Sequence, residues 1–199
     1  MSRLLIWSGI DAWRAEAATI ELGVDGLSAT GTQIGAEPLP YRLEYQLEVE
    51  DAWITRELRV TARGNGWSRR LDLRHDRAGR WSADVSRAGH VSLAEPGGDL
   101  DAVASALDCD LGLCALTNTM PVRRHDLHVR ADARDFLMAW VSVPDLGLHA
   151  SPQRYEHVGR RAGRLVVRYV GERRDYVGEL ELDDDGFVLL YPELARRVA

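Results

Sequence analysis

The stretch YRLEYQLEV, residues 41–49, decides the fold class of this protein. Its odd-numbered residues are apolar or aromatic, and its even-numbered residues are charged or polar. Successive side chains of a β-strand point to opposite faces of the sheet, so a period of two is typical of a strand with one buried face. Residues 41–49 are therefore predicted to form a half-buried β-strand.

The same period continues along the chain after short turns. Apolar residues recur at Ile54, Leu58 and Val60, and again from Trp67 onward after the Gly-Asn-Gly stretch at residues 64–66. Asn-Gly supplies the positive φ angles that a tight hairpin needs. The pattern therefore predicts a succession of antiparallel hairpins rather than alternating strands and helices.

Helix signals are limited to residues 100–107 and to a short turn after Pro192. Residues 86–98 contain three glycines and a proline, and they are predicted to be the longest irregular segment. The expected fold is mainly β, with one curved antiparallel sheet and one or two short helices.

Composition indicates one globular domain over residues 1–199, with 45% hydrophobic residues. All 25 basic residues are arginines, and 31 acidic residues give a net charge of −6. This acidic balance argues against nucleic-acid binding, which needs a basic face. The only apolar run near the start, residues 4–7, is too short for a membrane segment or a signal sequence, so a cytoplasmic protein is expected. Cys109 and Cys114 are expected to be reduced thiols.

Arginines occur at positions where the strand period places apolar residues. Arg56 is in step with Leu58, Arg69 with Leu71, and Arg123 with Leu127. An inward guanidinium is costly unless it is paired. One interpretation is an open sheet edge, a side chain that snorkels to solvent, or internal salt bridges, for example to Glu57 or Asp72. The other is an apolar cavity of several hundred Å³ with arginines at its mouth, which would suit the head group of an amphiphile.

The common catalytic motifs are absent from the sequence, including the Gly-x-Ser-x-Gly elbow and the His-Glu-x-x-His motif. Asp108 and Asp110 would share one face of a strand, where they could act as acid and base or pair with nearby arginines. His125 and His128 would lie on opposite faces of a strand, so no metal site is expected. No cofactor is expected either.

Several short motifs resemble the bacterial glycolipid-binding family, originally a domain of unknown function. The most specific is Thr-Asn-Thr-x-Pro-x-Arg-Arg at residues 117–124. The others are Tyr45-Gln46-Leu47-Glu48-Val49 with Trp53-x-Thr55-Arg56, Gly79-Arg80-Trp81, Asp108-Cys109-Asp110, Gln153-x-Tyr155 and Tyr191-Pro192. The chain departs from the family pattern at Ala115-Leu116, where the family has Pro-Phe. The resemblance implies a single-domain spiral β-roll, which is an incompletely closed barrel, and it implies no known catalytic residue.

The leading hypothesis is a lipid- or glycolipid-binding protein whose partner is a small amphiphile, rather than an enzyme. The alternatives are a hydrolase or isomerase acting on an amphiphilic or sugar-containing substrate, and a protein-interaction scaffold. The candidate ligand-binding residues combine the inward arginines, the carboxylate pair and the family motifs. They are Arg56, Arg69, Arg80, Trp81, Asp108, Asp110, Asn118, Thr119, Arg123, Arg124 and Tyr155.

Overall fold

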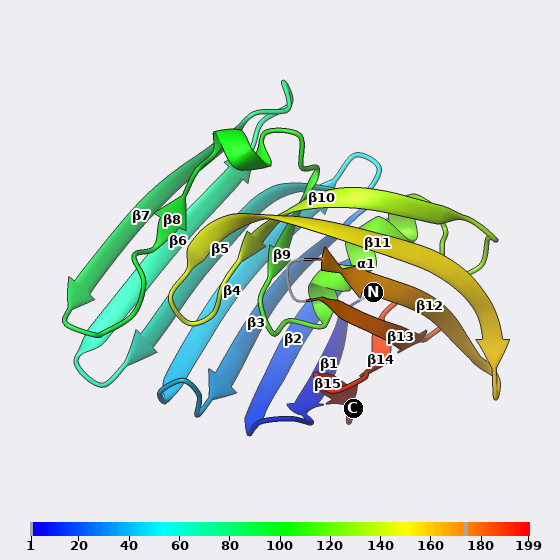
Figure 1. The fold of residues 1–199 in the computed structure, drawn as a ribbon, viewed down its shortest axis with the longest axis horizontal. Coiled ribbons are helices and arrows are strands. Elements are labelled where there is room, and N and C mark those ends of the chain that lie inside the picture. The colour runs from blue at the N-terminus through cyan, green and yellow to red at the C-terminus, as the bar shows by residue number, and fades with distance from the viewer. Residues whose placement is uncertain (1, 173–174) are drawn as a thin grey trace.

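The computed structural model describes residues 2–172 and 175–199, and most of this part of the chain is β-strand (Figure 1). Within it, fifteen strands form one sheet that curves around a short helix and is not closed into a barrel. Strand pairs are antiparallel except for two parallel pairs near one end. The predicted mainly β fold with one curved, incompletely closed sheet is confirmed.

The first half of the sheet is a meander in which each strand pairs with the next one along the chain. Its strands are β1 (Ser2–Gly9), β2 (Arg14–Leu22), β3 (Leu27–Gly35), β4 (Tyr41–Glu50), β5 (Ile54–Gly64), β6 (Trp67–His75) and β7 (Trp81–Gly89). The odd-numbered residues of β4 from 41 to 49 are all buried, as the period of two predicts. Gly66 has a φ of 75°, which the β5–β6 hairpin requires.

The second half completes the sheet from the other side. Its strands are β8 (Gly97–Gly98), β9 (Asp108–Leu111), β10 (Ala133–Val141), β11 (Gly147–Arg161), β12 (Arg164–Gly171), β13 (Tyr176–Leu182), β14 (Val188–Tyr191) and β15 (Ala195–Arg197). The last strand pairs with the first, with Trp7 opposite Arg197. This junction joins the two halves into one sheet, whose ends are β7 and β9.

The α-helix of the described residues lies inside the curve of the sheet, not where the sequence predicted a helix (Figure 1). The predicted helix at residues 100–107 is wrong: the 3-10 turn η1 (Asp101–Val103) forms there, and a turn follows it before β9 begins at Asp108. A second 3-10 turn, η2 (Leu116–Asn118), leads into the helix α1 (Thr119–Arg124). Pro121 fits in α1 because the first-turn amides of a helix need no intrahelical partner.

Two further predictions about local structure need correction. His125 and His128 follow α1 in a turn, so they do not lie on opposite faces of a strand. The segment predicted to be irregular is shorter than residues 86–98, because β7 continues to Gly89 and β8 pairs with β11. After Pro192 the chain makes a turn, as predicted.

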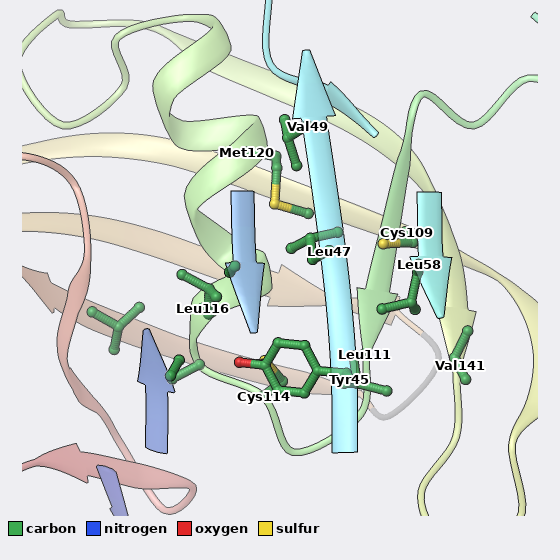
Figure 2. Packing of buried hydrophobic residues seen from close by; sticks show 14 of the residues in the cluster. Tyr45, Leu47, Val49, Leu58, Cys109, Leu111, Cys114, Leu116, Met120 and Val141 are labelled. Atoms are coloured by element: carbon green, nitrogen blue, oxygen red, sulfur yellow. The ribbon is translucent and has the colours of Figure 1, made fainter. Parts of the chain in front are cut away.

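The hydrophobic core lies between the concave face of the sheet and the elements inside its curve. Leu116 of η2 and Met120 of α1 are fully buried and face Leu47 of β4 (Figure 2). Leu111 of β9 is buried in the same cluster as Leu58 of β5. These side chains fill the space between β4, β5 and the elements packed on them.

Candidate functional site

Arg56, Arg69 and Arg123 are the arginines that the strand period placed among apolar residues. Each of them makes structural contacts of a different kind. Arg56 is the extra residue of a β-bulge in β5, where Thr55 pairs with Val49 and Glu57 with Glu48. Its guanidinium donates to the Asp51 carboxylate at 2.6 Å. The bulge therefore moves Arg56 out of step with Leu58, and the strand period does not carry it into a cavity.

Arg69 is buried, as its strand position predicts. Its guanidinium donates to main-chain carbonyls of Leu93 (3.2 Å) and Asp145 (3.0 Å), and also to that of Ala94. The carboxylate suggested as its partner, Asp72, binds Arg70 instead at 2.7 Å. Arg69 thus ties the connection after β7 to the turn after β10.

Arg123 and Arg124 lie at the end of helix α1, so the strand period does not apply to them. The Arg123 guanidinium carbon lies 4.8 Å from the ring centre of Trp53 and makes a cation–π contact. Arg124 binds both oxygens of Asp108, one of them at 2.8 Å, and also the carbonyl of Trp53. Burial raises the pKa of Asp108, and the Arg124 guanidinium opposes that rise.

Asp110, two residues further along β9, is held by hydroxyl and amide groups. One of its carboxylate oxygens accepts from Thr117 Oγ1 at 2.8 Å, and the other accepts from Gln153 Nε2 at 2.7 Å. These bonds fix the carboxylate against η2 and β11. A group placed beside Asp110 would meet a positioned acceptor rather than a mobile side chain.

A tyrosine links this carboxylate network to η2. Tyr155 Oη lies 2.9 Å from Asn118 Oδ1 and 3.0 Å from Gln153 Oε1. A hydroxyl has one proton, so at any moment it donates to only one of these two amide oxygens. Burial raises the pKa of Tyr155 well above its usual value, and the group remains a hydroxyl.

Asp110 and its neighbours form one wall of a pocket of about 170 Å³ between β9–β11 and the C-terminal strands. This polar wall consists of Asp110, Asn118, Ser151 and Gln153. The pocket is also lined by the aromatic residues Trp140, Tyr169, Tyr176 and Tyr191. The rings of Tyr169, Tyr176 and Tyr191 lie 5.6 to 6.0 Å apart and are tilted against one another. The remaining lining residues are Asp11, Leu111, Gly112, Leu113, Cys114, Gly171, Pro192, Glu193 and Leu194.

The pocket is smaller than the several hundred Å³ expected from the sequence, and no arginine among residues 2–172 and 175–199 lines it. Of the candidate residues, it brings together Asp110 and Asn118, with Tyr155 behind them. Thr119 is buried in α1, and Arg80 pairs with Asp76 at 3.0 Å on the surface. Trp81 is buried, stacks on His75 at 4.5 Å and donates to the Ala106 carbonyl.

Sequence reasoning missed Glu16, a buried carboxyl group on the core face of β2. It accepts from Tyr45 Oη at 2.7 Å, from Cys114 Sγ at 2.9 Å and from the Ala115 amide at 3.3 Å (Figure 2 shows Tyr45 and Cys114). Burial raises the pKa of Glu16, and the hydrogen bonds from Cys114, Tyr45 and the Ala115 amide oppose that rise. Burial also raises the pKa of Cys114 well above its usual value, which keeps it a thiol.

The strand period could have identified these missed residues. Glu16 is in step with the buried Ala18 and Ile20, just as Ser151 and Gln153 are in step with the buried Tyr155. A polar residue at a core position is the same signal that singled out the arginines. The aromatic lining has no such signal, because it comes from four separate strands.

In residues 2–172 and 175–199, no three His, Cys, Asp or Glu side chains gather in a way that could hold a metal ion. None of the helices in this same part of the chain has the length and apolar character needed to cross a membrane.

Comparisons with known proteins agree with the fold. The structure is similar to the crystal structure of a DUF1089 family protein from Pseudomonas aeruginosa, with a TM-score of 0.69 and 24% identity over 96% of this chain and 94% of that one. No curated protein matches the chain. The model of the family described as "Putative glycolipid-binding" matches residues 4–197. The chain therefore belongs to this glycolipid-binding family.

Proposed function

We propose that this protein binds the sugar head group of an amphiphile in the pocket beside Asp110. The observation that carries the proposal is the pairing of a polar wall with an aromatic lining around one small pocket. Sugar hydroxyls donate to fixed carboxylate and amide oxygens, while the apolar face of a sugar ring packs on aromatic side chains. The family name supports a glycolipid as the ligand.

Asp110, Gln153 and Asn118 supply the acceptors. Asp110 is fixed by Thr117 and Gln153, and Tyr155 shares its proton between the amide oxygens of Asn118 and Gln153. A ligand hydroxyl that donates to one of these oxygens leaves the Tyr155 proton for the other. The network therefore favours a ligand rich in hydrogen-bond donors.

The size of the pocket selects a head group rather than a whole lipid. A cavity of about 150 Å³ holds a benzene molecule, whereas pockets for drug-sized ligands begin near 300 Å³. At about 170 Å³, the pocket has room for roughly one ring. The acyl chain of a bound amphiphile would extend past Leu113 and Leu194, which are apolar residues of the same lining.

The test is calorimetric titration with octyl β-glucoside below its micelle concentration. Asp110→Asn should weaken binding at least tenfold, because a neutral amide is a weaker acceptor than a carboxylate. Asp84→Asn is the matched control, since Asp84 pairs with Arg74 at an exposed position of β7. Equal affinity of octyl glucoside and octanol, or of wild type and Asp110→Asn, would overturn the proposal. Native mass spectrometry of freshly purified protein would identify a co-purifying ligand.

Catalysis is a second candidate because Asp110 lines the pocket, where a carboxylate could act as a general acid or base. The measurement is release of nitrophenol from nitrophenyl glycosides and esters. Turnover that Asp110→Asn abolishes, while octyl glucoside affinity stays within twofold of wild type, would favour a hydrolase over a binding protein.

A further inference from the structure

The turn between β1 and β2 exposes two large apolar side chains. Ile10 is 47% exposed and Trp13 is 68% exposed, and they flank Asp11, which lines the pocket. Single exposed apolar residues are common on soluble proteins. A tryptophan and an isoleucine on one short turn at the edge of a ligand pocket are a more specific arrangement.

The turn is tied to its neighbours by hydrogen bonds that hold its backbone in place. Arg14 donates to the Asp11 carboxylate at 2.6 Å and also to the Leu194 carbonyl. The Ile10 amide donates to the same Leu194 carbonyl at 3.1 Å, and the Trp13 carbonyl accepts from the Ala36 amide at 3.3 Å. These bonds join the turn to the segment after β14 and to the end of β3.

The exposed turn is continuous with the pocket. Asp11 and Leu113 line both the pocket and a shallow hollow of about 270 Å³ beside Trp13. The lining of this hollow is mixed: Pro38, Tyr41 and Val143 are apolar or aromatic, and Arg14 and Glu37 are charged. An acyl chain that leaves the pocket past Leu113 would meet the apolar members of this lining on its way toward Trp13.

We propose that the β1–β2 turn docks this protein on a lipid surface and brings the pocket to the membrane interface. The inference rests on the proposed function, since the docked surface would supply the amphiphile. Tryptophan is favoured at membrane interfaces because its ring is apolar and its N–H is polar. Glu37 and Glu193 are exposed beside the turn, and the protein carries a net charge of −6. These charges match a zwitterionic surface better than an anionic one.

The experiment is flotation of the protein with phosphatidylcholine vesicles. The double variant Ile10→Ser/Trp13→Ser should lower the vesicle-bound fraction at least tenfold. The control is Leu4→Ser/Val24→Ser, which removes apolar side chains that are 59% and 87% exposed but lie away from the pocket lining. The control should bind vesicles as the wild type does, and phosphatidylglycerol vesicles should bind wild type more weakly.

Four results would overturn the inference: no flotation of the wild type, equal flotation of the double variant, an equal loss in the control, or stronger binding to phosphatidylglycerol. A wild-type dimer that the double variant breaks, without any vesicle binding, would also overturn it in favour of a protein contact. Calorimetry with monomeric octyl glucoside separates the two proposals. The double variant should keep wild-type affinity in solution, while failure of the wild type to bind this glucoside would count against the proposed function alone.

Discussion

Glu16 and Asp110 are both carboxyl groups in the interior of the roll, and their surroundings differ in access to solvent. Glu16 is enclosed by Tyr45, Cys114 and the Ala115 amide, and burial raises its pKa. Asp110 lines the pocket and is held by Thr117 and Gln153. The comparison shows that one curved sheet holds two kinds of carboxyl group: Glu16 in a region sealed from solvent, and Asp110 as a positioned acceptor in a region open to the pocket.

Asp108 adds a third arrangement, because it is buried and paired with Arg124. It lies only two residues from Asp110 on β9, yet it does not line the pocket. Glu16 and Asp108 are therefore both carboxyl groups that are buried outside the pocket. Substitutions there should change stability, whereas substitutions around Asp110 should change ligand affinity.

The largest effect is expected for Arg124→Met, which leaves the buried Asp108 carboxylate without its cation. Removing one partner of a buried ion pair costs about 3–5 kcal/mol of unfolding free energy. Urea denaturation measures this loss. Arg59→Met is the control, because Arg59 pairs with Glu57 at an exposed position and such pairs contribute about 1 kcal/mol or less. A loss below 1 kcal/mol for Arg124→Met would show that the Asp108 site is not sealed.

The next largest effect is the difference in unfolding free energy between Glu16→Ala and Asp110→Ala. Glu16→Ala leaves the buried Tyr45 hydroxyl and Ala115 amide without an acceptor, and we expect a loss of about 3 kcal/mol. Asp110→Ala should cost about 1 kcal/mol, because water can enter the pocket and bind Thr117 and Gln153. Both values come from urea denaturation at one pH. Equal losses would remove the distinction between the sealed and the open region.

The period of two in residues 41–49 was enough to predict the mainly β fold, because burial on one face of a sheet imposes that period. The family motifs indicated the curved, open roll. Strand parity placed Arg69 correctly and misplaced Arg56, because a β-bulge shifts β5 by one residue. The helix at 119–124 was missed, since its six residues are too few for a helical period and it depends on packing inside the curve.

The pocket could be predicted only in part. Asp110, Asn118 and Tyr155 were singled out from local motifs, and the structure brings them into one network. Its aromatic lining depends on which distant strands the curved sheet places side by side. Tyr169 and Tyr191 meet because β12 and β14 both flank β13, and no local pattern contains that information.

The pH dependence of the unfolding free energy would test the surroundings of Glu16. The raised pKa of Glu16 means that the folded protein keeps a proton that the unfolded chain releases above a pH of about 4.3. This contribution to stability is complete below that pH and is lost as pH rises through the folded pKa. Between the two values, the unfolding free energy of wild type should fall by about 1.4 kcal/mol per pH unit relative to Glu16→Gln. A difference between the two proteins that does not vary with pH would contradict a raised pKa of Glu16.

The smallest effects should come from the arginines that the sequence placed at a cavity mouth. Arg56→Ala and Arg123→Ala should leave octyl glucoside affinity within twofold, because both side chains are held by contacts away from the pocket. Gln153→Leu, measured in the same calorimetric titration, should weaken binding about tenfold, or about 1.4 kcal/mol. Weaker binding by either arginine variant, without a loss of stability, would indicate that the substituted arginine takes part in ligand binding.

The pairing of β15 with β1 has a consequence for how the chain folds during synthesis. Strands β1 to β7 can pair in order as they leave the ribosome. The other edge of β1 stays unpaired until residues 195–197 have been synthesised. Until then, that edge offers unpaired amide and carbonyl groups to any passing strand. Such distant pairing also slows folding, because a long loop must close before the contact forms. Nascent chains halted before residue 195 should therefore associate with one another, and those released with β15 should not.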